Sequence, residues 1–283
     1  MKRVSGALIM LLVATSACAI PSTPVATIPA EVSDTPVASE PPVVITDTAV
    51  APPPTTNLTC YELSLFIDPA MASSYDCQKV PASNADFDVY PEHTLLTLNG
   101  YPLAGKFFEA KIAVYPLESY RSLQPDFVND RVALLQNLIS GATTPTFAGS
   151  FGPALPFLPV FNAGQIFFAH YQVLPFVNGS GIRFLTEYAQ YYAPVNNNDL
   201  FYTYQGMTAD GQYWISAILP INHPMLPADA NNPPNGQTWE EFSNAYEPYI
   251  ADMVNQLNSQ PPESFIPTLT ALDALASSIV IQP

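Results

Sequence analysis

Residues 165–221 read QIFFAHYQVLPFVNGSGIRFLTEYAQYYAPVNNNDLFYTYQGMTADGQYWISAILPI, and this stretch decides the fold. Runs rich in aromatic and β-branched residues predict four strands, at 165–176, 181–190, 199–206 and 211–221. Turn signals separate them, notably NGSG at Asn178–Gly181 and ADG at Ala209–Gly211. Because the connections are short, we expect a four-stranded antiparallel meander. The first run carries bulky residues on both faces, which is typical of a central strand.

The segment before the meander predicts a hairpin and a helix. Residues 94–98 and 106–115 are β-rich runs joined by NGYPLAG, the pattern of a hairpin with a longer loop. Apolar residues at three- and four-residue spacing predict a helix over 126–140. The Gly-, Pro- and Phe-rich residues 142–160 have no period, and we expect an irregular loop that covers apolar surface.

The segment after the meander predicts two more helices. Thr238 with Glu241 three residues later forms a capping-box pattern, and Pro248 should kink or divide the helix that follows. A second helix is expected at about Pro267–Ser277. The order of elements is hairpin, helix, meander, helix, helix. Such blocks indicate an α+β fold, an antiparallel sheet packed by helices, within one domain over residues 58–283.

The N-terminus predicts export. Residues 1–17 have the basic start, short apolar run and small residues of a signal peptide. Cys18 then stands where a lipobox places its lipidated cysteine, which predicts a lipid-anchored protein; the alternative is cleavage at Ala17 or Ala19 and free secretion. Residues 18–57 are dense in Pro, Thr and Ala, and this composition predicts a disordered tether.

The remaining cysteines, Cys60 and Cys77, form an even pair in an exported chain. We expect a structural disulfide, because exported proteins reside in oxidising compartments. The alternative, a metal site, lacks a second Cys or His pair nearby.

The composition limits the classes of molecule that the protein can bind. The chain carries 24 acidic and eight basic residues, and a strongly negative protein repels nucleic acid. Charged residues make up only 11% of the chain, well below the usual quarter, so Asn, Gln, Ser, Thr and Tyr must cover much of the surface. Such a surface suits an extracellular setting and is compatible with carbohydrate contact.

Two stretches resemble known groups. The ending FIPTLTALDALASSIVI (265–281) resembles the ends of Mog1/PsbP-like chains, which implies an antiparallel sheet between helical layers. The phrases in residues 173–227, from VLPFVNGSG to INHPMLP, resemble those of a group of uncharacterised bacterial exported lipoproteins, and the resemblance extends over most of Leu58–Pro283. That resemblance implies a fold and an extracytoplasmic location, and it brings no known activity.

The chain contains no local catalytic motif, metal-ligand spacing or cofactor motif. Histidines at 93, 170 and 223 have no ligand spacing, and the Asn-rich loops lack the pattern of a dedicated calcium loop. Candidate ligand contacts are Arg183, Glu187, His170 and Trp214. Arg183 either holds an anionic ligand or pairs with Glu187, four residues on along the same strand face. Carboxylates that folding could bring together are Asp86, Asp88, Glu187 and Asp210.

Two functions remain open. The first is a lipid-anchored extracytoplasmic domain without catalytic activity that binds a protein or a glycan. The second is an extracellular hydrolase acting on glycans or peptides through carboxylates assembled by the fold. A pocket with two carboxylates within about 10 Å would favour the hydrolase, and a closed surface with Arg183 paired to Glu187 would oppose it.

Overall fold

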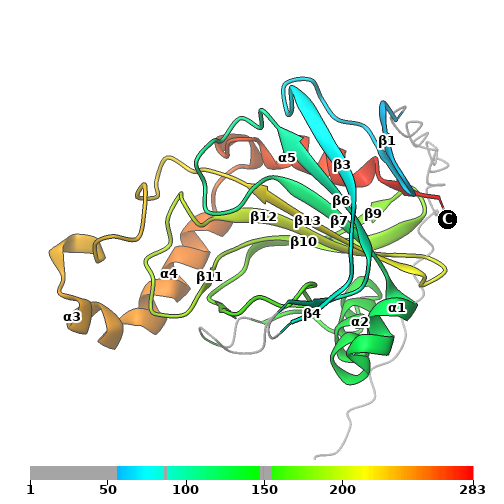
Figure 1. The fold of residues 1–283 in the computed structure, drawn as a ribbon. Helices are drawn as coiled ribbons and strands as arrows, with labels where there is room; N and C mark the ends of the chain where they lie inside the picture. The colour runs from blue at the N-terminus through cyan, green and yellow to red at the C-terminus, as the bar shows by residue number, and fades with distance from the viewer. Residues whose placement is uncertain (1–55, 86–87, 147–148, 150–154, 283) are drawn as a thin grey trace, which may run out of the picture. The chain divides into compact units, whose positions relative to one another are not determined.

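A computed structural model describes residues 56–85, 88–146, 149 and 155–282 (Figure 1). The expected signal peptide, Cys18 and nearly all of the expected tether lie outside the described residues. Asn57, at the end of that tether, exchanges hydrogen bonds with the backbone of Ile67 at 2.8 and 2.9 Å.

The fold is α+β and is built on one antiparallel sheet of seven strands (Figure 1). In spatial order the strands are β3 (Ser74–Val80), β6 (His93–Asn99), β7 (Lys111–Pro116), β13 (Tyr213–Pro220), β12 (Phe201–Thr208), β10 (Gly179–Thr186) and β9 (Ala169–Phe176). The expected hairpin is β6–β7, and the expected meander is β9–β10–β12–β13. Both predictions are confirmed. Strand β3 had no clear sequence signal, because most of its side chains are exposed.

Strand β9 is an edge strand, so the expectation that the first run of the meander is central is wrong. The strand begins at Ala169, and Gln165 belongs instead to β8 (Gly164–Gln165), which pairs with β11 (Tyr188–Ala189). Pro175 lies within β9, and proline is tolerated at a sheet edge because no neighbouring strand needs its missing N–H. On one face of β9, Leu174 packs against the core that contains residues of α4 and α5, and on the other Tyr171 and Val173 pack against the core that contains residues of α1 and α2.

Three shorter pairings complete the strands. β1 (Leu58–Cys60), β2 (Leu63–Leu65) and β14 (Val280–Ile281) form a small sheet that joins the start of the described domain to its end. β4 (Ser83–Ala85) pairs with β5 (Asp88–Tyr90), and β8 pairs with β11.

Helices cover both faces of the large sheet, and they are α1 (Leu117–Leu123), α2 (Pro125–Ile139), α3 (Trp239–Asn244), α4 (Tyr246–Asn258) and α5 (Leu269–Ser277). One apolar core contains residues of α1 and α2, and the other contains residues of α3, α4 and α5. The side chains on the two faces of β13 enter different cores. Ile215, Ala217 and Leu219 enter the second core and Trp214 enters the first, as the alternation predicts.

The helix boundaries follow local chemistry. The Thr238 side chain accepts from the backbone N–H of Glu241, and the Glu241 carboxylate accepts from the backbone N–H of Thr238, so the capping box is confirmed. The chain breaks at Ala245, between α3 and α4. Pro248 lies one turn later, where its ring excludes the helical position of the Asn244 carbonyl. Thr268 caps α5 in the same way, through the backbone N–H of Ala271.

Cys60 and Cys77 form a disulfide, with an S–S distance of 2.09 Å, which links β1 to β3. Within the described part of the chain, no helix is both long enough and apolar enough to cross a bilayer.

Candidate functional site

Arg183 is engaged in a buried network between the sheet and α5. Its Nε lies 3.2 Å from Oδ1 of Asp273, and its Nη2 donates to Oε1 of Gln172 at 2.8 Å. Nη1 donates to the backbone carbonyl of His170. The Tyr202 hydroxyl donates to the same Asp273 oxygen at 2.9 Å. Through these contacts Arg183 joins β10, β9 and α5, and its guanidinium is buried within the protein and not presented to a ligand.

The expected pairing of Arg183 with Glu187 is therefore wrong. Strand β10 ends at Thr186, and its register against β9 shifts between Arg183 and Leu185. Alternation of side chains applies only within a regular strand, so four residues of separation do not place these two on one face.

The histidines act as packing residues with hydrogen bonds. His170 Nε2 lies 2.7 Å from the Leu257 carbonyl oxygen, and its ring packs edge-on against Phe265. His93 Nδ1 lies 2.9 Å from the Pro91 carbonyl oxygen, and His223 Nε2 lies 2.9 Å from the Ser264 hydroxyl. Burial lowers the pKa of all three rings, which favours the neutral form. Across the described ranges, no group of three His, Cys, Asp or Glu side chains is placed to hold a metal ion.

The other sequence candidates do not come together. Trp214 is fully buried and donates from Nε1 to Oε1 of Gln205 at 2.8 Å. Asp210 caps its turn through Thr208 and the backbone N–H of Gln212, which lowers its pKa. Asp88 is exposed at the start of β5, and Asp86 lies outside the described residues. Among the candidate carboxylates that the structure describes, Glu187 lines a cavity.

That cavity has a volume of about 610 Å³, within the usual ~300–1,000 Å³ of small-molecule sites. The segment carrying β8 and the segment carrying β11 form one side of it. Its lining combines aromatic rings with amides and carboxylates: Phe107, Phe108, Phe161, Tyr188, Tyr191, Asn162, Gln190, Asn198, Glu187, Asp199, Asp229 and Asn231, with four alanines. We call it the larger cavity.

Two of its carboxylates are held by one amide. The Asn196 side-chain nitrogen lies 2.9 Å from Oδ2 of Asp199 and 3.5 Å from Oε2 of Glu187. The Asn196 backbone N–H donates to Oε1 of Glu187 at 2.7 Å. Burial raises the pKa of Glu187 well above its ordinary range, and the neighbouring Asp199 adds to the rise. Glu187 is therefore a neutral acid over a pH range in which ordinary carboxyls are charged.

This arrangement limits what the pair can do. The Asp199 and Glu187 oxygens bound by this amide can be no farther apart than its two distances taken together, which is shorter than the ~6.5–9.5 Å of an inverting glycosidase pair. A glycosidase needs the scissile bond to lie between its two carboxyls. Here the Asn196 amide occupies the space between them. The geometry suits binding better than hydrolysis.

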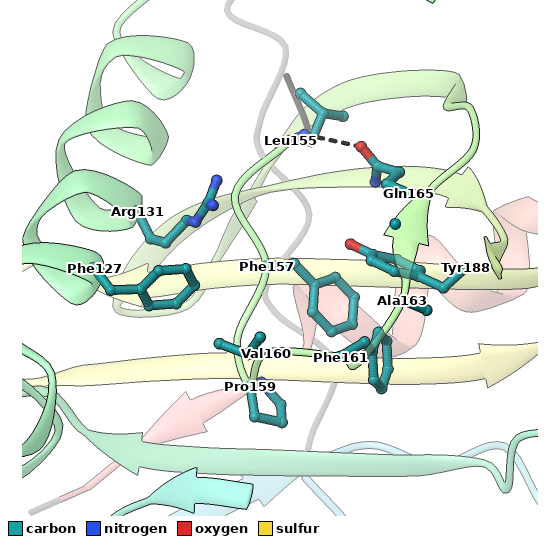
Figure 2. A pocket seen from close by; sticks show the side chains of 11 residues that line it. Phe127, Arg131, Leu155, Phe157, Pro159, Val160, Phe161, Ala163, Gln165 and Tyr188 are labelled. Carbon is teal, nitrogen blue, oxygen red and sulfur yellow. Dashed lines mark hydrogen bonds between the residues drawn. The ribbon is translucent and has the colours of Figure 1, made fainter. Parts of the chain in front are cut away.

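A smaller cavity of about 150 Å³ adjoins the larger one and shares Phe161, Ala163 and Tyr188 with it (Figure 2). Arg131 of α2 and Gln165 of β8 complete its polar lining. The loop after residue 155 forms its wall, and two side-chain oxygens hold that loop. Oε1 of Gln165 accepts from the Leu155 N–H at 2.9 Å, and Oε1 of Gln205 accepts from the Leu158 N–H at 3.2 Å.

The sequence indicated part of this region. The aromatic loop was predicted to cover apolar surface, and its described residues Leu155, Phe157 and Leu158 are buried against the sheet. Arg131, and not Arg183, is the arginine that meets this loop. Asp199 went unrecognised as the partner of Glu187, although it ends the conspicuous run Asn196–Asp199. The eleven residues between Glu187 and Asp199 carry no periodic signal that would have predicted their contact.

We find no match to this chain among protein-family models, curated proteins or solved structures.

Proposed function

We propose that this protein is a lipid-anchored extracytoplasmic binding domain that holds a glycan in the larger cavity. The observation that carries the proposal is the lining of that cavity. Aromatic rings can pack against the apolar C–H faces of a sugar, and amide and carboxylate side chains can bond its hydroxyl groups. Phe107 and Tyr191 are 68% and 56% exposed, which makes them available to a ligand.

The location is supported by two features of the chain. The Cys60–Cys77 disulfide is of a kind that persists in oxidising compartments outside the cytoplasm. The lipobox pattern at Cys18 supplies the anchor, and the Pro- and Thr-rich residues that follow would separate the domain from the membrane. A freely secreted protein is the alternative.

A hydrolase is the second candidate, and one observation favours it. Burial raises the pKa of Glu187, so this carboxyl can serve as a general acid, and the Asp199 side chain lies beside it. The Asn196 amide between them, and the burial of Glu187 to 1% exposure, favour the binding function.

The test is calorimetric titration of the purified domain with a panel of soluble cell-surface oligosaccharides. Tyr191→Ala and Phe107→Ala should each weaken binding of the best ligand about 5- to 30-fold, because truncating an aromatic contact residue typically costs about 1–2 kcal/mol. Both side chains are exposed, so the melting temperature should stay within about 2 °C of the wild type.

Tyr75→Ala is the matched control, since Tyr75 is 47% exposed on β3 and does not line the larger cavity. Its affinity should equal that of the wild type. Absence of binding across the panel, or an equal loss in the control, would overturn the glycan proposal. Cleavage of an oligosaccharide that Glu187→Gln abolishes would replace the binding function with the hydrolase.

A further inference from the structure

The smaller cavity presents hydrogen-bond donors that have no acceptor among the residues the structure describes. Gln165 is the clearest case, because it is only 7% exposed and its Nε2 has no hydrogen-bond partner in that part of the chain. Its orientation is fixed by chemistry. The Leu155 N–H can only donate, so the atom 2.9 Å from it must be the amide oxygen, and the NH₂ group must lie on the other side. A buried donor without an acceptor calls for an explanation.

Tyr188 supplies a second donor. It is the cross-strand partner of Gln165 in the β8–β11 pair, and both side chains line the smaller cavity (Figure 2). Among the described residues, its hydroxyl makes no hydrogen bond. Burial raises the pKa of Tyr188, so the hydroxyl keeps its proton at neutral pH and remains a donor.

Arg131 supplies a charged donor. It lies one turn after Phe127 on α2, and its guanidinium carbon is 4.8 Å from the centre of the Phe127 ring. Within the described ranges, no carboxylate lies close enough to Arg131 to form an ion pair. The lining of the smaller cavity includes neither Asp nor Glu. Positive charge and donors therefore meet there without a protein anion, in a chain whose formal net charge is −16.

The walls around these donors are aromatic. Phe127, Phe157 and Phe161 line the cavity together with Pro159 (Figure 2). Its volume of about 150 Å³ matches that of an engineered apolar cavity in another protein that admits one benzene ring. The site is thus of a size for one ring, with hydrogen-bond donors in its wall.

We propose that the smaller cavity binds a small aromatic carboxylate of the benzoate type. The ring lies among the phenylalanines, and the carboxylate accepts from Arg131, with Gln165 and Tyr188 as the neutral donors. Guanidinium and carboxylate form the strongest pairing of these groups. This site is independent of the glycan proposal, because Arg131 and Gln165 do not line the larger cavity.

The test is a ligand-observed NMR titration of the wild-type domain with benzoate, benzyl alcohol and benzylamine. Benzoate should bind with a Kd below about 10 mM and at least ~10-fold more tightly than benzyl alcohol, since a hydrogen bond to a charged group is worth at least that factor. Benzylamine should bind no better than benzyl alcohol, because its charge has the wrong sign for Arg131.

Two variants probe the polar contacts. Arg131→Gln should weaken benzoate at least ~10-fold and leave benzyl alcohol unchanged. Gln165→Leu should weaken benzoate less, and a melting curve must first show that it is folded, since it also removes the acceptor for the Leu155 N–H. Arg121→Gln is the matched control, because Arg121 lies on α1 and does not line the cavity.

Equal binding of benzoate and benzyl alcohol would overturn the proposal and leave an apolar cavity. Unchanged benzoate affinity in Arg131→Gln would overturn it as well. Absence of binding by all three compounds would also overturn the proposal, because the donors would then be satisfied by water alone. Oligosaccharide binding tested on Arg131→Gln separates the two sites: its persistence with loss of benzoate supports both proposals, and a joint loss contradicts their independence.

Discussion

Removing the carboxylate of Asp273 should destabilise the domain strongly. The Arg183 side chain is only 6% exposed, and Asp273 is its ion-pair partner at 3.2 Å. Tyr202, which is fully buried, donates its hydroxyl to the same oxygen. Asp273→Ala therefore leaves a buried charge without its counter-ion and a buried hydroxyl without its acceptor. Breaking one side of a buried pair costs about 3–5 kcal/mol.

We expect a loss of about 3 kcal/mol, at the lower end of that range, because 22% of the Asp273 side chain is exposed and water can partly replace it. For a domain of this size, about 3 kcal/mol lowers the melting temperature by roughly 6–12 °C. Asp273→Asn keeps an acceptor for Tyr202 and should lie between the alanine variant and the wild type.

The assay is urea unfolding followed by tryptophan fluorescence, which reports on the buried Trp214. Glu118→Ala is the matched control. It removes the partner of Arg121 at 4.0 Å, and Glu118 is 95% exposed, so its loss should be below about 1 kcal/mol. If Asp273→Ala is no more destabilised than Glu118→Ala, the network does not stabilise the packing of α5 on the sheet and the reasoning is refuted.

Three further outcomes are expected. Burial raises the pKa of Glu187, so the folded state binds its proton more tightly and the stability of the wild type falls as pH rises above ~4.3. The difference in melting temperature between Glu187→Gln and the wild type should therefore be at least ~3 °C larger, in favour of the variant, at pH 8 than at pH 4. An equal difference at both pH values would contradict this. Reduction of the Cys60–Cys77 disulfide should cost about 3 kcal/mol, seen as a lower melting temperature, and an unchanged melt would show that the bond contributes nothing. Cys18→Ser should move the full-length protein from the membrane fraction to the soluble fraction on cell fractionation, and retention would exclude the lipid anchor.

The sequence by itself determined the elements whose signals are local. The capping box at Thr238 and Glu241 depends on residues three apart, and the break before Pro248 depends on one ring and one preceding carbonyl. The meander followed from alternation and from short turns such as Asp210-Gly211, because neighbouring strands with short connections pair antiparallel. The disulfide followed from an even pair of cysteines and an export signal.

Only the tertiary structure determined which polar side chains contact one another and which of them line a cavity. The sequence alone allowed an ion pair between Arg183 and Glu187. In the structure the register of β10 shifts after Arg183, and α5 places Asp273, 90 residues away, beside the guanidinium. Asn196 contacts both Glu187 and Asp199, because the segment after β11 folds back along the same cavity that Glu187 lines. Burial, charge pairing and cavity lining depend on contacts between distant segments, and no periodic pattern encodes them. Local sequence patterns were sufficient to predict the fold, whereas the positions of the candidate sites depend on how distant segments pack together.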